Sequence, residues 1–173
     1  IGPGIQPQTT AGADIKATTA WDSAKGDPEV IIAILDSGVD MTHPDLTAKV
    51  VSPGRDFAND DDDATDDNWH GTHVAGIATA DTDNSEGIAG VAWNCKILPV
   101  KVTEADGTGF YSWIIDGIIW AADQGADVIN LSLGGDFDDP FLEDACKYAF
   151  DRGVVVVASA GNDYGGPVLY PAA

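Results

Sequence analysis

Basic residues are scarce in this sequence of 173 residues. Lysine and arginine together number 8 and aspartate and glutamate number 29, so the formal net charge is −21 at neutral pH. Such an acidic chain repels phosphate groups, which argues against nucleic acid and anionic membranes as partners. The excess of carboxylates instead suits cation binding, or a protein that works at high salt or low pH.

Long apolar runs, a leader and cysteines are also scarce or missing. No apolar stretch approaches the ~18 residues of a membrane span, and Ile1-Gly2-Pro3 is no signal peptide. If the protein is secreted, we expect its targeting segment to have been removed. The two cysteines, Cys95 and Cys146, either form one disulfide or are two buried thiols, and the sequence leaves both open. The length suits one domain, which buries roughly 70% of its unfolded surface.

Apolar runs alternate with helical patterns along the chain. The run 30–35 holds six consecutive apolar residues, which predicts a strand buried on both faces. No G-x-G-x-x-G turn follows it, which disfavours a nucleotide-binding module. Further strands are predicted at 97–102, 127–133 and 154–158, with a strand-like pair at 50–51, and helices at 14–24 (capped by Asp14), 70–80, 112–124 and 140–152. This alternation predicts an α/β fold with a mostly parallel twisted sheet and helices on both faces, in three layers.

An aspartate and a histidine occupy positions where chemistry is expected. Asp36 ends the first strand, and the carboxyl end of such a strand is where open α/β sheets build their sites. His70 opens a predicted helix. Alone, each residue is ordinary, but together an acid can orient the imidazole while the imidazole takes a proton from a nucleophile. The pair predicts two thirds of a catalytic relay.

The segment 56–68 holds seven aspartates, at positions 56, 60, 61, 62, 63, 66 and 67. Charge runs are usually solvated loops, but here a strand-like pair and a helix fix both ends. Carboxylates held this close repel one another, and a hard cation with oxygen ligands relieves that repulsion. The spacing is not that of an EF-hand, because no glycine lies mid-loop and no glutamate closes it. We therefore expect a calcium site here. A second oxygen-rich loop follows at 81–87.

Four motifs occur in a fixed order: Asp36-Ser37-Gly38, His70-Gly71-Thr72-His73, Ser132-Leu133-Gly134-Gly135 and Ala160-Gly161-Asn162. In this order and spacing they resemble the subtilisin-family serine endopeptidases (subtilases), from about Gln6 to the last residue. Each motif alone is weak, whereas the four in register are specific. The resemblance implies a subtilisin-like fold, serine endopeptidase activity, protein or peptide substrates, Ca²⁺ as cofactor and an extracellular location.

The resemblance also implies residue roles. Asp36 would support His70, the general base and later the general acid, and Asn162 would donate its side-chain amide to the oxyanion. A peptide substrate would add as a strand between two segments, Gly107, Thr108, Gly109 and Ser132, Leu133, Gly134. Residues 158–161, which include Ala160 and Gly161, would line the pocket for the residue before the cut, together with Gly134 and Gly135. The family's strong calcium site would use Gln6, Asp45 and Asn84, with backbone oxygens around Thr82, Glu86 and Ile88. A second site, like that of the calcium-rich thermostable branch, would use Asp56, Asn59, Asp61 and Asp63.

Two departures from the family pattern carry expectations of their own. The residue before the catalytic histidine is usually glycine and here is Trp69, so the rim of the cleft is expected to differ. The Gly-Thr-Ser-Met-Ala motif that carries the family's nucleophile does not occur in these residues. We therefore expect residues 1–173 to be the N-terminal part of a single peptidase domain, with the serine on a second chain, a C-terminal fragment of the same peptidase. The alternative is a calcium-binding protein of this ancestry that binds peptides without cleaving them.

Overall fold

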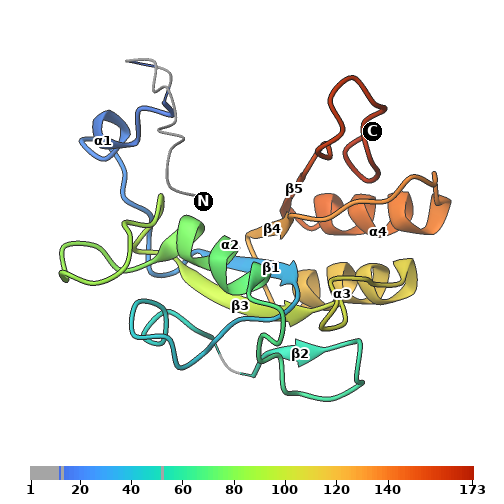
Figure 1. Ribbon diagram of the computed structural model, residues 1–173, viewed down its shortest axis with the longest axis horizontal. Coiled ribbons are helices and arrows are strands. Elements are labelled where there is room, and N and C mark those ends of the chain that lie inside the picture. Colours follow the sequence, from blue (N-terminus) through green and yellow to red (C-terminus); the bar gives the residue numbers. More distant parts are fainter. Residues whose placement is uncertain (1–11, 13, 52) are drawn as a thin grey trace, which may run out of the picture.

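Five parallel strands form the centre of the computed structural model, which describes residues 12, 14–51 and 53–173 (Figure 1). In the order in which they lie across the sheet, the strands are β2 (Arg55–Asp56), β3 (Lys96–Lys101), β1 (Ile31–Asp36), β4 (Val128–Leu131) and β5 (Val155–Ala158). Each neighbouring pair is parallel. The sheet confirms the predicted fold class.

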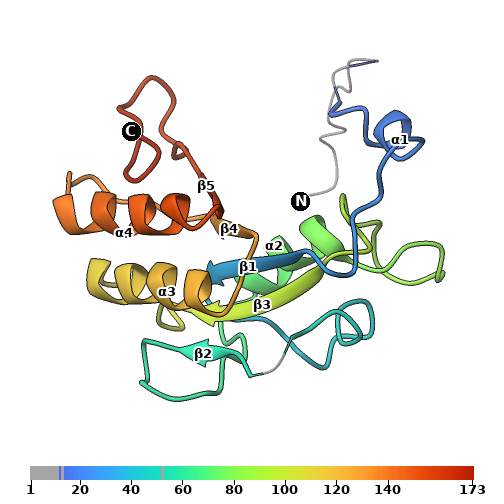
Figure 2. The ribbon, with the colours of Figure 1, turned by 180° about the vertical axis from the view of Figure 1, so that it is seen from behind.

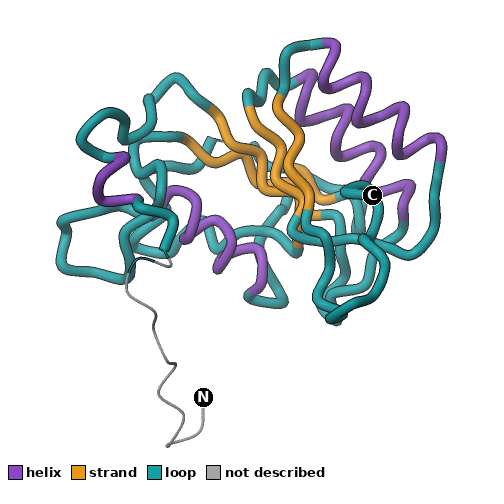
Figure 3. Tube along the Cα trace, turned by 90° about the horizontal axis from the view of Figure 1, so that it is seen from above, coloured by secondary structure: helices purple, strands orange, loops and turns teal. Residues whose placement is uncertain are grey.

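Helices cover both faces of this sheet, as the view from above shows (Figure 3). α2 (His70–Thr79) lies on one face, while α3 (Tyr111–Asp123) and α4 (Pro140–Asp151) lie side by side on the other. The short helix α1 (Ala17–Ala20) lies away from the strands, as the view from behind shows (Figure 2). The molecule therefore has the three layers that the alternating pattern predicts.

The buried side chains of β1 alternate between two cores. Ala33 and Leu35 belong to the larger core, which includes residues of α3 and α4, and Ile34 belongs to the smaller core with residues of α2. All three are fully buried. A strand covered on both faces needs apolar side chains in both directions, which explains the uninterrupted apolar run.

The central position of β1 determines where a site can form. The chain leaves β1 for β2 and β3 on one side and then continues to β4 and β5 on the other. The carboxyl end of β1 is therefore a point where the strand order reverses, which is where open α/β sheets bind ligands. Asp36 is the last residue of β1, and its register partner in β3 is Lys101.

Two elements differ from their predictions. The predicted helix 14–24 is reduced to the four residues of α1. Lys16, with φ of +56°, is the N-cap and makes no side-chain cap bond, so the helix begins only at Ala17. Asp14 does not cap the helix and instead accepts the N–H of Lys16 at 2.7 Å. The strand-like pair 50–51 makes only an isolated bridge to β3, and the edge strand begins at Arg55.

The structure answers whether the two cysteines pair and whether a described helix could cross a membrane. Cys95 is buried and Cys146 half-buried, and both are free thiols. Of the two alternatives that the sequence left open, the structure shows the unpaired one. Among the helices that the structure describes, none combines the length and the apolar character needed to cross a bilayer.

Candidate active site

The side chains of Asp36 and His70 meet at the carboxyl end of β1. Nδ1 of His70 lies 2.7 Å from Oδ1 of Asp36, and the same oxygen accepts the N–H of Ser37 at 2.8 Å. The carboxylate is buried, with 4% of the aspartate exposed, whereas 41% of the histidine side chain is exposed. A ring held through Nδ1 by a buried carboxylate presents Nε2 for proton exchange.

Two glycines allow α2 to approach the end of β1. A Cβ on Gly71 would overlap the carbonyl oxygen of Gly38 and lie 3.1 Å from the Cβ of Asp36. Gly38 itself has φ of +104°, and a Cβ there would lie 2.6 Å from the carbonyl oxygen of Ala64. Both positions therefore require glycine. The close approach brings His70, the first residue of α2, within reach of Asp36.

The residue before the histidine has an unusual backbone. Trp69 is the N-cap of α2 with φ of +87°, a left-handed value that is rare for a bulky residue. Its side chain is 72% exposed. Its ring packs edge-on against the ring of His70, with 5.9 Å between the centroids. The structure therefore places an exposed indole beside the histidine, at the position where the sequence indicated an altered rim.

A cavity of about 330 Å³ lies beside the Asp36–His70 pair. Besides these two residues it is lined by Trp69 and by four of the predicted substrate-binding residues, namely Gly107, Ser132, Leu133 and Gly134. The other predicted residues of this segment lie in the adjoining turn. Thr108 donates its hydroxyl and N–H to Asp106, whose pKa these bonds lower, and Gly109 packs against the backbone of Val102.

The segment after β5 lies at the same edge of the sheet. The carbonyl of Ala160 accepts the N–H of Leu169 at 3.1 Å, and the side chain of Leu169 packs against Gly134 and Gly161. Asn162 is exposed and does not line the cavity. The structure thus links Gly134 with Gly161 through Leu169 but does not bring Asn162 against the histidine.

A buried lysine near the pair was not predicted from the sequence. Lys101, the last residue of β3, is only 1% exposed. Its ammonium group donates to the carbonyl of Ser37 at 3.1 Å and forms an ion pair with Asp67. Buried lysines of this kind are usually paired. The one signal in the sequence is the position of the lysine, inside an otherwise apolar predicted strand.

Two of the predicted residues of the first calcium site, Asn84 and Ile88, contact the carboxylate of Asp45. This aspartate is 2% exposed and accepts the side-chain amide of Asn84 at 2.6 Å and the N–H of Ile88 at 3.2 Å. A Cβ on Gly87 would overlap the carboxylate. Oγ1 of Thr82 is buried without a hydrogen-bond partner among the described residues. The carboxylate of Asp45 accepts N–H donors in this structure, and Thr82 offers a buried hydroxyl oxygen. Carboxylate and hydroxyl oxygens are ligands that a hard cation prefers.

Glu86 and Gln6 are the remaining predicted members of this first calcium set. Glu86 is exposed and contributes its N–H to Asn84 at 3.1 Å. Gln6 lies outside the described residues. Within the described part of the chain, no group of three or more His, Cys, Asp or Glu side chains is placed to hold a metal ion.

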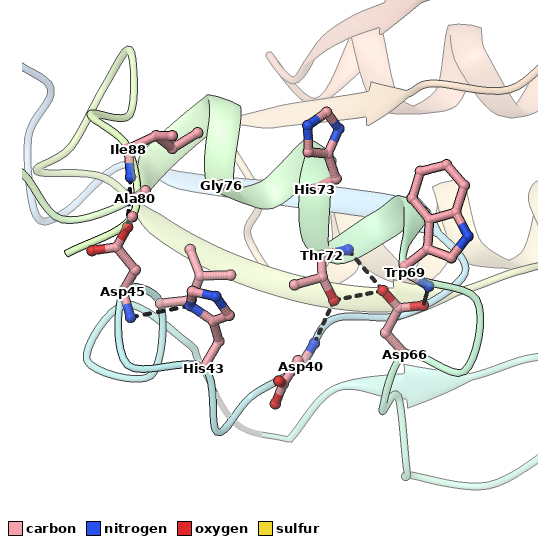
Figure 4. A pocket seen from close by; sticks show the side chains of 12 residues that line it. Asp40, His43, Asp45, Asp66, Trp69, Thr72, His73, Gly76, Ala80 and Ile88 are labelled. Atoms are coloured by element: carbon pink, nitrogen blue, oxygen red, sulfur yellow. Dashed lines mark hydrogen bonds between the residues drawn. The ribbon is translucent and has the colours of Figure 1, made fainter. Parts of the chain in front are cut away.

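A larger cavity of about 560 Å³ separates this carboxylate from the start of α2 (Figure 4). Asp45 and Ile88 lie at one end of the cavity, and Asp66 and Trp69 lie at the other. The predicted calcium loop and the turn before His70 are therefore two walls of one cavity.

The aspartate-rich segment satisfies many of its own carboxylates. Asp56 is 2% exposed, and its oxygens accept two backbone N–H groups and the side-chain amide of Asn59. Its backbone pairs in both directions with that of Asp61. Asp63 accepts the hydroxyl of Thr65 at 2.5 Å, and this bond lowers the pKa of Asp63. The second predicted calcium set thus combines a buried, hydrogen-bonded Asp56 with exposed side chains at Asn59, Asp61 and Asp63.

Comparison with known proteins identifies the family of this chain. The family model described as the subtilase family, peptidase S8, matches residues 27–173. A thermophilic serine proteinase from Bacillus sp. strain AK1 is 53% identical over 88% of this chain and 38% of its own length. Thermitase from Thermoactinomyces vulgaris is 49% identical over 91% of this chain and 56% of its own length.

A solved protease structure is similar to this chain in both fold and sequence. A protease from Pseudoalteromonas arctica PAMC 21717 superposes with a TM-score of 0.75 at 41% identity, over 84% of this chain and 53% of the solved one. The chain therefore spans about half the length or less of the relatives it matches. The family match over residues 27–173 and these identities show that the chain belongs to the subtilase family.

Proposed function

We propose that this chain supplies the acid, the base and much of the substrate-binding edge of a serine endopeptidase. The main support is the 2.7 Å contact between buried Asp36 and accessible His70 at the wall of a cavity. His70 would take the proton of a serine hydroxyl as that oxygen attacks a peptide carbonyl, and would then pass the proton to the leaving amine. Asp36 would keep the ring oriented and stabilise its charged form.

Asn162 is the proposed donor to the oxyanion that forms on the attacked carbonyl. Its place after β5, at the same edge of the sheet as Asp36, supports this role, although it does not line the cavity. Removal of one such donor costs about 3–4 kcal/mol of transition-state stabilisation.

The peptide substrate is proposed to lie extended against two glycine-containing segments. These are 107–109, together with 132–134, and they include Gly107 and Gly134 in the cavity wall. Glycines permit a peptide backbone to come close, and main-chain hydrogen bonds to the segment edges would hold it. Ala160 and Gly161, which contact Leu169 beside Gly134, would form the neighbouring wall.

The nucleophilic serine is proposed to lie outside residues 1–173, on a C-terminal part of the same peptidase domain. The hydroxyl groups of the serines near the pair form hydrogen bonds to other residues. Ser37 donates to the carboxylate of Asp66, Ser132 accepts the side-chain amide of Asn130, and Ser159 donates to the carbonyl of Leu133. Val155 and Val157 of β5 are 56% and 48% exposed. An apolar sheet edge of this kind supports further structure packing there.

Calcium is proposed as the cofactor of this domain. The first site would use Asp45 and Asn84, oxygens around Thr82, Glu86 and Ile88, and Gln6. When bound, the cation would neutralise the buried carboxylate of Asp45 and hold the loop 81–88 in place. A second site would use Asp56, Asn59, Asp61 and Asp63. An extracellular location is proposed as well, because calcium is available there at millimolar levels to fill both sites.

A serine-directed label tests the proposal on the complete protein. Wild-type protein should cleave a denatured protein substrate and gain one phosphonyl group from a phosphonyl fluoride, on a serine outside residues 1–173. His70→Ala should abolish both results, because the hydroxyl then lacks its base. Peptide binding without cleavage or labelling by the wild type would instead support the non-catalytic, peptide-binding alternative.

A further inference from the structure

The carboxylate of Asp66 accepts five hydrogen bonds beside the Asp36–His70 pair. Oδ1 accepts the hydroxyl of Ser37 at 2.8 Å and the N–H groups of Asn68 and Trp69, each at 2.9 Å. Oδ2 accepts the N–H of Thr72 at 2.9 Å and its hydroxyl at 2.5 Å. Figure 4 shows Asp66 between Trp69 and Thr72. The donors come from three parts of the chain.

Each donor lies within two residues of Asp36 or His70 in the sequence. Ser37 follows Asp36 directly, Trp69 precedes His70 directly, and Thr72 lies in the first turn of α2. The network extends one step further, because the hydroxyl of Ser37 accepts the N–H of Gly71 at 3.0 Å. Asp66 therefore ties the residue after the acid to the residues on both sides of the histidine.

The turn that Asp66 holds is strained. Trp69 has φ of +87°, a conformation that bulky residues avoid unless the surroundings impose it. The two successive N–H groups of Asn68 and Trp69 point to one carboxylate oxygen in this conformation. Asp66 thus supplies the contacts that keep the turn in a shape its sequence does not favour.

Only an ionised carboxylate satisfies all five donors. Burial opposes ionisation of Asp66, but the hydrogen bonds from Thr72, Asn68 and Ser37 outweigh it and lower its pKa. A carboxylate accepts at both oxygens, whereas an asparagine would present an NH₂ group to donors at one of the two positions. The substitution Asp66→Asn therefore breaks part of the network while keeping the size of the side chain.

We propose that Asp66 is a positioning residue for the relay: its carboxylate sets the place of the His70 ring relative to Asp36 by holding the strained turn at Trp69. This inference rests on the proposed peptidase function. It assigns to Asp66 no contact with the substrate. A small displacement of a catalytic base lowers turnover strongly, whereas substrate contacts elsewhere in the cleft keep binding unchanged.

The first test compares Asp66→Asn with Asp144→Asn in the complete protein. Asp144 is an exposed residue of α4, so its variant makes the same change of charge away from the site. Asp66→Asn should lower kcat by about 10- to 100-fold with KM changed less than about threefold, and Asp144→Asn should leave both as they are. A kcat for Asp66→Asn within threefold of the wild type would overturn the proposal.

A second substitution separates positioning from a general loss of structure. Glycine adopts a positive φ without strain, so Trp69→Gly should make the turn less dependent on Asp66. The kcat penalty of Asp66→Asn should be at least about fivefold smaller in the Trp69→Gly variant than in the wild-type protein. An equal loss of kcat in both proteins would contradict the proposal that Asp66 acts by holding the turn at Trp69. If Asp66→Asn does not fold, Thr72→Val replaces it, because this change removes one donor to Oδ2 of Asp66. Thr72→Val should lower kcat less than Asp66→Asn is expected to. Its loss of kcat should likewise be smaller in the Trp69→Gly variant than in the wild-type protein.

A readout without turnover distinguishes failure of this inference from failure of the proposed function. The Nδ1 proton of His70, held against Asp36, should be observable by NMR, and its rate of exchange with solvent is the readout. Asp66→Asn should speed its exchange with solvent by about tenfold or more, because the pair opens more often. Unchanged exchange would overturn the positioning role. A wild type without peptidase activity but with this change in exchange would reject only the proposed function.

Discussion

The Cα atom of Gly71 packs against the backbone carbonyl of Gly38, so that no side chain fits between α2 and the end of β1. Gly71→Ala would push the helix away from the strand and take His70 from Asp36. Overpacking of this kind costs about 1–3 kcal/mol or more. We expect a loss of that size in the free energy of unfolding, measured by urea denaturation, and a fall in kcat.

Gly76 provides the matched control in the same helix. A Cβ at this position would lie 3.8 Å from Cδ1 of Ile88, which is an ordinary contact. Because alanine favours a helix interior more than glycine does, Gly76→Ala should stabilise the protein by about 0.5–1 kcal/mol. Equal stabilities for the two variants would show that the contact at Gly71 is looser than described.

His70→Ala should lower kcat of the complete protein by about 10⁴-fold or more while KM changes little. This magnitude comes from measured serine proteases, subtilisin among them, and not from the present geometry. In the proposed mechanism the ring takes up a proton in the transition state, so its loss lowers turnover more than binding. His73→Ala is the control, since His73 is exposed in the same helix. Turnover of the His70 variant near that of the control would reject the assignment.

Removal of calcium should lower the melting temperature. A site filled at about 100 times its Kd contributes roughly 2.7 kcal/mol, which corresponds to about 5–10 °C for a domain of this size. Scanning calorimetry with and without chelator at low salt measures the shift. Asp45→Asn should remove most of it and Asp144→Asn should not. A melting temperature indifferent to chelator would count against both calcium sites.

Trp69→Gly should make the protein more stable. Release of the left-handed strain gains about 1–2 kcal/mol, and the greater chain entropy of glycine offsets part of that, so a net gain of about 0.5–1 kcal/mol is expected. The ring is mostly exposed, hence little apolar burial is lost. The same variant should accept bulkier substrate residues, measured as kcat/KM over a peptide series. A less stable variant would show that the indole packs usefully.

The low pKa of Asp66 predicts a loss of stability in acid. A carboxylate whose pKa is lower in the folded state stabilises the fold above its unfolded pKa of about 4. That contribution is lost as pH falls below about 4 through the folded value. Melting curves between about pH 6 and about pH 2.5 should therefore show a steeper acid loss for the wild type than for Asp66→Asn. If the melting temperatures of the two proteins fell equally with pH, the predicted contribution of Asp66 would be contradicted.

The parts of this molecule that follow local patterns could be predicted from the sequence. The apolar run before Asp36 predicts β1, and the small residues after His70 predict α2, so the meeting of these two side chains was expected. The burial of Lys101 was not, because a lysine next to apolar residues usually extends to solvent and only the fold brings Asp67 to it.

The proposed role of Asp66 could not be predicted from the sequence either, because it also depends on contacts between distant elements. Among seven aspartates in one segment, nothing local distinguishes the one that receives donors from Ser37 and Thr72. Those donors lie on other elements, and their convergence depends on how α2 docks on the sheet. The edge strand β2 was missed in the same way, since pairing with β3 and not its own sequence makes Arg55–Asp56 a strand.

The pairing of β1 has a kinetic consequence. Ile31 pairs with Lys96 and Ile32 with Val128, so the central strand has both of its neighbours far along the chain. Loops of that length must close before these contacts stabilise anything, and such topologies fold slowly. During synthesis, β1 emerges long before either neighbour and keeps its apolar surface exposed, in a state prone to association. We therefore expect the pairing of β1 with these distant strands to limit the rate at which the protein folds.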